Sequence, residues 1–104
     1  MSVTDYPKVS SYNGNEPFLF VSYSHRDSDI VLPIIAALQN AGYRIWFDRG
    51  IEAGSEWSDN IAARLRTCSA LVFFASKNSV ASENCLDEVA YAKSNGKPAL
   101  LAFL

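Results

Sequence analysis

Short apolar runs alternate along the chain with segments whose apolar residues recur three or four positions apart. The runs are rich in aromatic and β-branched residues, which favours strands buried on both faces, and they cover residues 18–23, 43–47, 68–75 and 98–104. The periodic segments favour helices, and they cover residues 29–41, 57–65 and 83–94. Strands that alternate with helices over short connections predict a parallel sheet with right-handed crossovers and helices on both of its faces.

Polar residues and glycines indicate where these helices begin and end. Ser28 or Asp29 is in position to cap the first helix, and Gly42 ends it. Ser82 is in position to cap the third helix, which ends at Gly96.

The third helix and the segment before it give two further expectations. Residues 76–82 are polar and predict a loop. Leu86, Val89 and Ala90 have the spacing of a core-facing stripe. We therefore expect this face of the helix to pack on the sheet.

Length and composition fit one folded domain. The chain has 104 residues, of which 49% are hydrophobic and 19% charged, a balance typical of globular proteins. Residues 1–17 are polar and show no periodicity, so we expect a mobile lead-in followed by a domain over residues 18–104. The net charge of −2 gives no basic surplus for a nucleic-acid partner.

Several classes of site and location are disfavoured by residue counts. Two cysteines and one histidine are too few for a disulfide framework or a histidine-based zinc site, so we expect no metal. The apolar runs are shorter than the ~20 residues that span a bilayer, and the N-terminal segment lacks the apolar core of a signal peptide. We expect a cytoplasmic protein with reduced thiols.

Ligands of parallel α/β sheets bind beyond the carboxyl ends of the strands. This rule places a site near residues 23–27, 47–57 and 76–88. The phosphate loop G-x-x-x-x-G-K-[ST] and the dinucleotide motif G-x-G-x-x-G are both absent from the sequence. The acidic residues of a phosphoacceptor receiver domain are missing from the ends of the first and third predicted strands. A catalytic triad could be written only from Ser24, His25 and Asp48, and nothing in the sequence gives them the required geometry.

Three segments in order resemble the sequence boxes of a Toll/interleukin receptor (TIR) domain of the type common in bacteria. They are F-V-S-Y-S-H-R-D at residues 20–27, F-D-R-G-I-E-A-G-S-E-W at residues 47–57, and the pair S-K-N-S at 76–79 with S-E-N-C-L-D-E-V at 82–89. The resemblance implies a flavodoxin-like, doubly wound parallel sheet with strand order 2-1-3-4 and a fifth strand beyond it. That fifth strand and a final helix would follow Leu104, so we expect this sequence to be a piece of a longer protein.

The resemblance also implies one of two functions. Many members of the family cleave NAD⁺ to nicotinamide and ADP-ribose or a cyclic product, while others only assemble with further TIR domains as scaffolds. NAD⁺ would be a substrate here, with no cofactor. In the enzymes a glutamate on the third helix is catalytic, and it matches Glu88. Glu88 falls in a helical column with Asn84 and Ala92, offset from the expected core face, so its side chain need not be buried in the core and can face the cleft.

The same resemblance assigns a substrate pocket and an assembly loop. The residues matched to NAD⁺ binding are Tyr23, Ser24, His25, Arg26, Phe47, Asp48, Trp57, Asn84 and Cys85. The BB loop, which in the family moves against a neighbouring domain on assembly, is matched by Arg49, Gly50, Ile51, Glu52, Ala53, Gly54 and Ser55. The partners implied are NAD⁺ and other TIR domains, including copies of this chain.

Each of these residues also has an ordinary structural interpretation. Tyr23 fits a half-buried strand end, Trp57 a helix-start anchor, and Cys85 a packing thiol. One departure bears on catalysis: Asn84 stands where the enzymes often carry a tryptophan. Glu88 therefore favours the enzyme, and Asn84 favours the scaffold.

Overall fold

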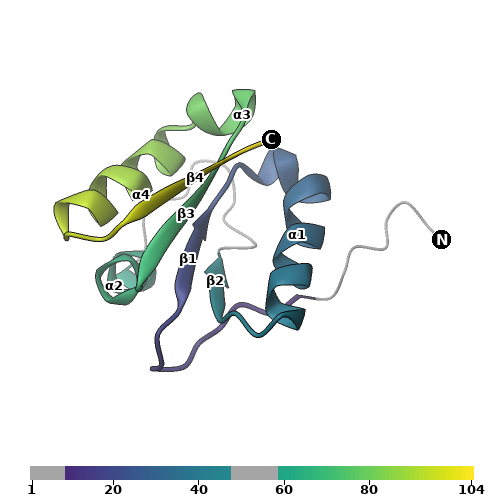
Figure 1. The fold of residues 1–104 in the computed structure, drawn as a ribbon. Helices are drawn as coiled ribbons and strands as arrows, with labels where there is room; N and C mark the ends of the chain where they lie inside the picture. Colours follow the sequence, from purple (N-terminus) through teal and green to yellow (C-terminus); the bar gives the residue numbers. More distant parts are fainter. Residues whose placement is uncertain (1–8, 48–58) are drawn as a thin grey trace.

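The computed structural model describes residues 9–47 and 59–104. In these residues four strands form one parallel sheet in the order β2-β1-β3-β4 (Figure 1). The strands are β1 (Leu19–Ser22), β2 (Ile45–Phe47), β3 (Ala70–Ala75) and β4 (Ala99–Phe103). The α/β fold and the strand order predicted from the sequence are confirmed.

Helices cover the two faces of the sheet. They are α1 (Ser28–Asn40), α2 (Asp59–Thr67), α3 (Lys77–Val80) and α4 (Glu83–Ser94), and a short 3₁₀ turn, η1 (His25–Asp27), precedes α1. Figure 1 shows α1 on one side of the sheet and α2 and α4 on the other.

Alternation along the strands divides the core into two clusters. In β1, Val21 packs with the α1 residue Ile35, whereas Phe20 packs with Leu65 of α2. Phe20 also stacks on Trp46, with ring centroids 4.8 Å apart. Because side chains alternate along a strand, Ser22 lies on the same side as Phe20, the side that α2 and α4 cover.

The two long helices end in the same hydrogen-bond pattern, as their glycines predict. After α4, Gly96 N–H donates to the carbonyl of Lys93 and Lys97 N–H donates to that of Ala92, with φ of +73° at Gly96. After α1, Gly42 has φ of +102° and makes the equivalent bond. Both are glycine-dependent helix ends.

The start of α1 differs from the prediction. Ser28 is already the first helical residue, and Asp27 holds the N-cap position without a side-chain cap bond. Ser24 caps the preceding 3₁₀ turn instead, accepting a hydrogen bond from Arg26 N–H. The expected caps Ser28 and Asp29 are wrong because this extra turn moves the helix start back along the chain.

The expected loop at residues 76–82 is also wrong in part, because it contains α3. Ser76 and Ser79 form a reciprocal capping box, in which each side chain accepts from the other residue's backbone N–H. A four-residue helix has too few positions to show an apolar period, so the pattern could not reveal it.

The buried face of α4 is a third difference. Cys85, Glu88 and Ala92 are buried, while Leu86 is 46% exposed. The stripe predicted from Leu86, Val89 and Ala90 is therefore wrong, with only Val89 packing on the core. The helix is rotated so that a carboxylate, rather than a leucine, faces the sheet.

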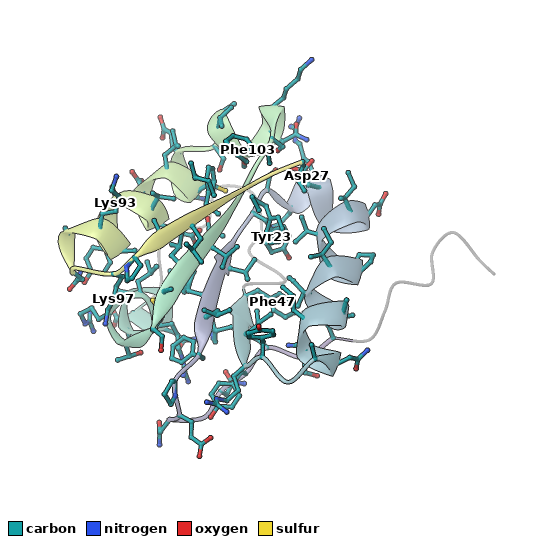
Figure 2. All side chains as sticks on the ribbon, in the orientation of Figure 1. Tyr23, Asp27, Phe47, Lys93, Lys97 and Phe103 are labelled. Atoms are coloured by element: carbon teal, nitrogen blue, oxygen red, sulfur yellow. The ribbon has the colours of Figure 1, made fainter. Side chains whose placement is uncertain are left out.

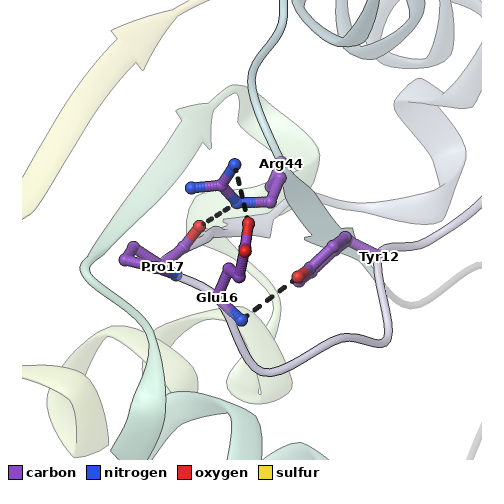
Figure 3. Close-up of polar contacts among 4 residues, drawn as sticks. All are labelled: Tyr12, Glu16, Pro17 and Arg44. Atoms are coloured by element: carbon purple, nitrogen blue, oxygen red, sulfur yellow. Dashed lines mark hydrogen bonds and ion pairs between the residues drawn. The ribbon is translucent and has the colours of Figure 1, made fainter.

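Residues 9–17 make more contacts than the sequence predicts. Tyr12 N–H donates to the carbonyl of Ile45 at 2.8 Å, and Phe47 N–H donates to Ser11 Oγ at 2.9 Å, so this segment lies along β2. Figure 3 shows Arg44 donating to the carbonyl of Pro17 and pairing with Glu16.

Candidate functional site

The carboxyl ends of β1, β2 and β3 form the edge where the sequence places a site. Tyr23 follows β1, Phe47 ends β2 and Ser76 follows β3. Helix α4 packs against β1 and β3 on one side of this edge. Figure 2 labels Tyr23 and Asp27 at this end of the sheet.

A buried hydrogen bond joins β1 to α4. The Ser22 hydroxyl donates to Oε1 of Glu88 at 2.6 Å. Ser22 is 1% exposed and Glu88 8% exposed. The expectation that Glu88 lies offset from the packed face of its helix is therefore wrong. Its carboxylate faces the end of the sheet, but from inside the fold.

The thiol of Cys85 lies in the same environment. Burial raises the pKa of Cys85 above its ordinary value, and the charge of Glu88 acts in the same direction. Hydrogen bonds with Ser82 and Ser22 act in the opposite direction. Cys85 is thus a protonated, buried thiol at neutral pH, as a packing cysteine is.

A second carboxylate, Asp27, is held at the same end of the sheet by the N-cap residue and the first turn of α3. Asp27 is 8% exposed and accepts from the Ser76 hydroxyl at 2.5 Å and from Asn78 Nδ2 at 2.8 Å. Its charge also acts on the Cys85 thiol. Two buried carboxylates thus lie on different elements at the carboxyl end of the sheet.

The structure separates the other predicted pocket residues into two groups. Tyr23 and Phe47 are buried in the α1-side core, where Tyr23 also makes an edge contact with the His25 ring. The second group reaches solvent: His25, Arg26 and Asn84 are exposed and Ser24 is partly exposed. Asp48, Trp57 and the predicted assembly loop at residues 49–55 lie outside the described residues.

Three polar residues of this site were not singled out from the sequence as site residues: Ser22, Asp27 and Ser76. Ser22 and Asp27 stand in the first sequence box, where a signal was present. Ser22 continues the alternation of β1, which points it toward α4. Asp27 and Ser76 both lie in ranges expected for the site, but their contact joins residues 49 positions apart and could not be predicted from either segment.

The described residues show neither a metal site nor a membrane helix. Within residues 9–47 and 59–104, no three His, Cys, Asp or Glu side chains are grouped as metal ligands. In the same residues no helix has the length and apolar character to cross a bilayer.

A surface hollow of about 530 Å³ lies elsewhere, beside the N-terminal segment. Residues 10–14 line it together with Gln39, Tyr43, Arg44 and Ile45. Ile45 begins β2, so this hollow is at the opposite end of that strand from Phe47.

Both the sequence and the fold are similar to those of known proteins. The profile that describes the TIR domain family matches residues 19–104. No curated protein matches the chain. Among solved structures, the TIR domains of the activated Roq1 resistosome recognizing the effector XopQ superpose with a TM-score of 0.73 at 20% identity, over 86% of this chain and 58% of that chain.

The TIR domain of the Toll-related receptor TRR-2 from Hydra magnipapillata superposes with a TM-score of 0.66 at 14% identity, over 80% of this chain and 66% of that one. The present chain therefore spans less than two thirds of either structure's length. At these identities the likeness concerns the fold alone.

Proposed function

The chain belongs to the TIR domain family, and from that premise we propose that it is an NAD⁺ nucleosidase. The reaction breaks the bond between nicotinamide and ribose. Water then bonds to the ribose carbon and releases a proton, which gives ADP-ribose, or a group of the same molecule takes the place of water, which gives a cyclic variant. The observation that carries the proposal is the Glu88 carboxylate, held by Ser22 at the carboxyl end of the sheet.

The chemistry needs only one carboxylate. The nicotinamide ring of NAD⁺ is a pyridinium that becomes neutral when its bond to ribose breaks. No acid therefore has to protonate this leaving group. The ribose then passes through an oxocarbenium-like transition state, as sugars do in glycoside hydrolysis. A fixed negative charge beside the ribose stabilises that positive charge, and in this proposal Glu88 supplies it.

Exposed residues beyond β1 would contact the rest of NAD⁺. Arg26 and His25 are exposed directly after β1 and provide donors for phosphate oxygens. Because Glu88 is 8% exposed, a productive pocket requires its neighbours to move aside. We infer that assembly with other TIR domains opens and completes the pocket, so the isolated chain turns over slowly.

A cytoplasmic setting is part of the same proposal. Cys68 and Cys85 are free and buried. Free thiols are usual in a reducing compartment, where NAD⁺ is also available.

The second candidate is a scaffold that acts by TIR–TIR assembly without catalysis. The exposed Asn84 favours it, because no aromatic surface stands one helical turn before Glu88. The Roq1 TIR domains belong to an activated resistosome, which shows assembly for that protein.

The two candidate functions differ in whether the folded chain consumes NAD⁺ and releases nicotinamide. NAD⁺ and nicotinamide are followed by chromatography at rising concentrations of the wild-type chain, of Glu88→Gln and of Glu83→Gln. Glu83 is an exposed glutamate on the same helix and controls for charge. Turnover in the wild type and in Glu83→Gln, but not in Glu88→Gln, supports the enzyme. Folded, self-associating wild type that leaves NAD⁺ intact supports the scaffold.

A further inference from the structure

The contact between Ser22 and Glu88 pairs a rigid side chain with a flexible one. Ser22 has one side-chain torsion and ends a strand that lies between β2 and β3. Glu88 has three torsions, and burying such a side chain costs rotamer entropy. A hydrogen bond of 2.6 Å to the short side chain fixes the carboxylate relative to the sheet.

The hydrogen bond from Ser22 affects the ionisation of the Glu88 carboxylate as well as its position, because both residues are buried. Burial disfavours an ionised carboxylate, and a donor to its charged form favours it. On the same helix, the Cys85 thiol is protonated and interacts with both Glu88 and Ser22. From the end of η1, the Asp27 charge acts on that same thiol.

We propose that Ser22 is a positioning residue for the reaction proposed above: its hydroxyl holds the Glu88 carboxylate ionised and in one place at the carboxyl end of the sheet. The inference rests on the proposed function, in which Glu88 acts as an anion. Ser22 acts through Glu88 and is 1% exposed, so it does not itself need to touch the substrate.

The first test is the pH profile of NAD⁺ cleavage by Ser22→Ala. Ser22→Ala removes a hydrogen bond to a charged group. The free energy of such a bond is large enough that its loss raises the pH of the acid limb of kcat/KM by about one unit. We expect kcat to fall about tenfold at neutral pH while KM stays within about twofold, because a carboxylate that is no longer held in place stabilises the transition state less. Ser22→Thr keeps the hydroxyl and restores the wild-type limb.

Ser79→Ala is the matched control. Ser79 is fully buried near the same end of the sheet, and its hydroxyl donates to the carbonyl of Phe74 at 2.7 Å. Its loss removes this bond of similar length, to a backbone carbonyl rather than to a carboxylate, together with the capping bond from Ser76 N–H. We expect Ser79→Ala to lower thermal stability without moving the acid limb.

A measurement that needs no turnover separates this inference from the proposed function. The Glu88 carboxyl is titrated by carbon NMR in wild type, Ser22→Ala and Ser79→Ala, and assigned with Glu88→Gln. A midpoint that moves to higher pH in Ser22→Ala alone supports the role of Ser22. An unchanged midpoint overturns it, whether or not NAD⁺ is cleaved. Wild type that never cleaves NAD⁺ overturns the proposed function, and the titration still decides whether Ser22 controls Glu88.

If Ser22→Ala does not fold, Ser22→Cys takes its place under reducing conditions. The thiol has a similar size and is a weak donor. The same upward shift is expected, smaller than for alanine, and a wild-type midpoint in folded Ser22→Cys overturns the role of Ser22.

Discussion

Asp27 and Ser76 are joined by a 2.5 Å hydrogen bond across 49 positions of the chain. The Ser76 hydroxyl that donates to Asp27 also accepts from the backbone N–H of Ser79 at 3.0 Å. One hydroxyl therefore ties the start of α1 to the start of α3. Asp27 and Ser76 both lie at the carboxyl end of the sheet, where Tyr23 follows β1 and Ser76 follows β3.

Removing the Asp27 carboxylate should destabilise the fold. Asp27→Ala leaves Ser76 and Asn78 without their acceptor, and we expect the free energy of unfolding in urea to fall by about 2 kcal/mol. Asp29→Ala is the control, since Asp29 is exposed on the first turn of α1. Equal losses in the two variants would show that the link contributes nothing.

The N-terminal segment should depend on Arg64 more than on Glu16. Arg64 donates to the carbonyls of Asn13 and Gly14 at 3.2 and 3.1 Å, and its guanidinium lies 5.5 Å from the centre of the Phe18 ring. We expect Arg64→Ala to cost about 1–2 kcal/mol of unfolding free energy, with partial recovery in Arg64→Lys.

The control is Glu16→Ala, which breaks an exposed ion pair with Arg44. Exposed pairs contribute about 0–1 kcal/mol. Hydrogen exchange of the Tyr12 amide, which bonds to Ile45, reports the same difference locally. Faster exchange in Glu16→Ala than in Arg64→Ala would contradict this account.

The end of α4 should require glycine for its backbone angle and not for space. A Cβ at Gly96 would meet nothing within 4 Å, yet φ there is +73°. Gly96→Ala should therefore cost about 1 kcal/mol, and Gly96→Asn less, because asparagine tolerates this conformation better. Thermal unfolding checks the order, and equal effects of the two substitutions would be inconsistent with a purely conformational cause.

Both thiols should resist modification until the chain unfolds. Burial raises the pKa of Cys85 and that of Cys68 above the ordinary 9.0. The unfolded chain therefore loses these protons first, so their contribution to stability is complete below pH 9 and declines as the pH rises above it. Urea unfolding from pH 7 to 10, together with iodoacetamide labelling, tests both effects. Rapid labelling of the native chain at pH 7 would contradict the prediction that both thiols are protected in the folded chain.

The fold was largely predictable because parallel strands buried on both faces leave continuous apolar runs, such as Leu71 to Phe74. Gly42 and Gly96 likewise marked helix ends through a local requirement on φ. The helix α3 was missed because its capping box uses two serines, without the acidic partner and apolar run that signal a start.

The rotation of α4 was missed for a tertiary reason. Leu86 has the hydrophobicity of a core residue, yet Cys85 and Glu88 face the sheet. The hydroxyl of Ser22 satisfies the carboxylate there, and that partner lies 66 positions away. The sequence resemblance found Glu88 itself, while only the structure shows what holds it.

The central claim is that the Glu88 carboxylate carries NAD⁺ cleavage. The most direct measurement is the rate of nicotinamide release at saturating NAD⁺ by wild type and by Glu88→Gln, at matched concentration and with matched circular dichroism. Glutamine keeps the shape and removes the charge, so we predict a loss of at least about 100-fold. Equal rates in the two proteins would contradict the claim.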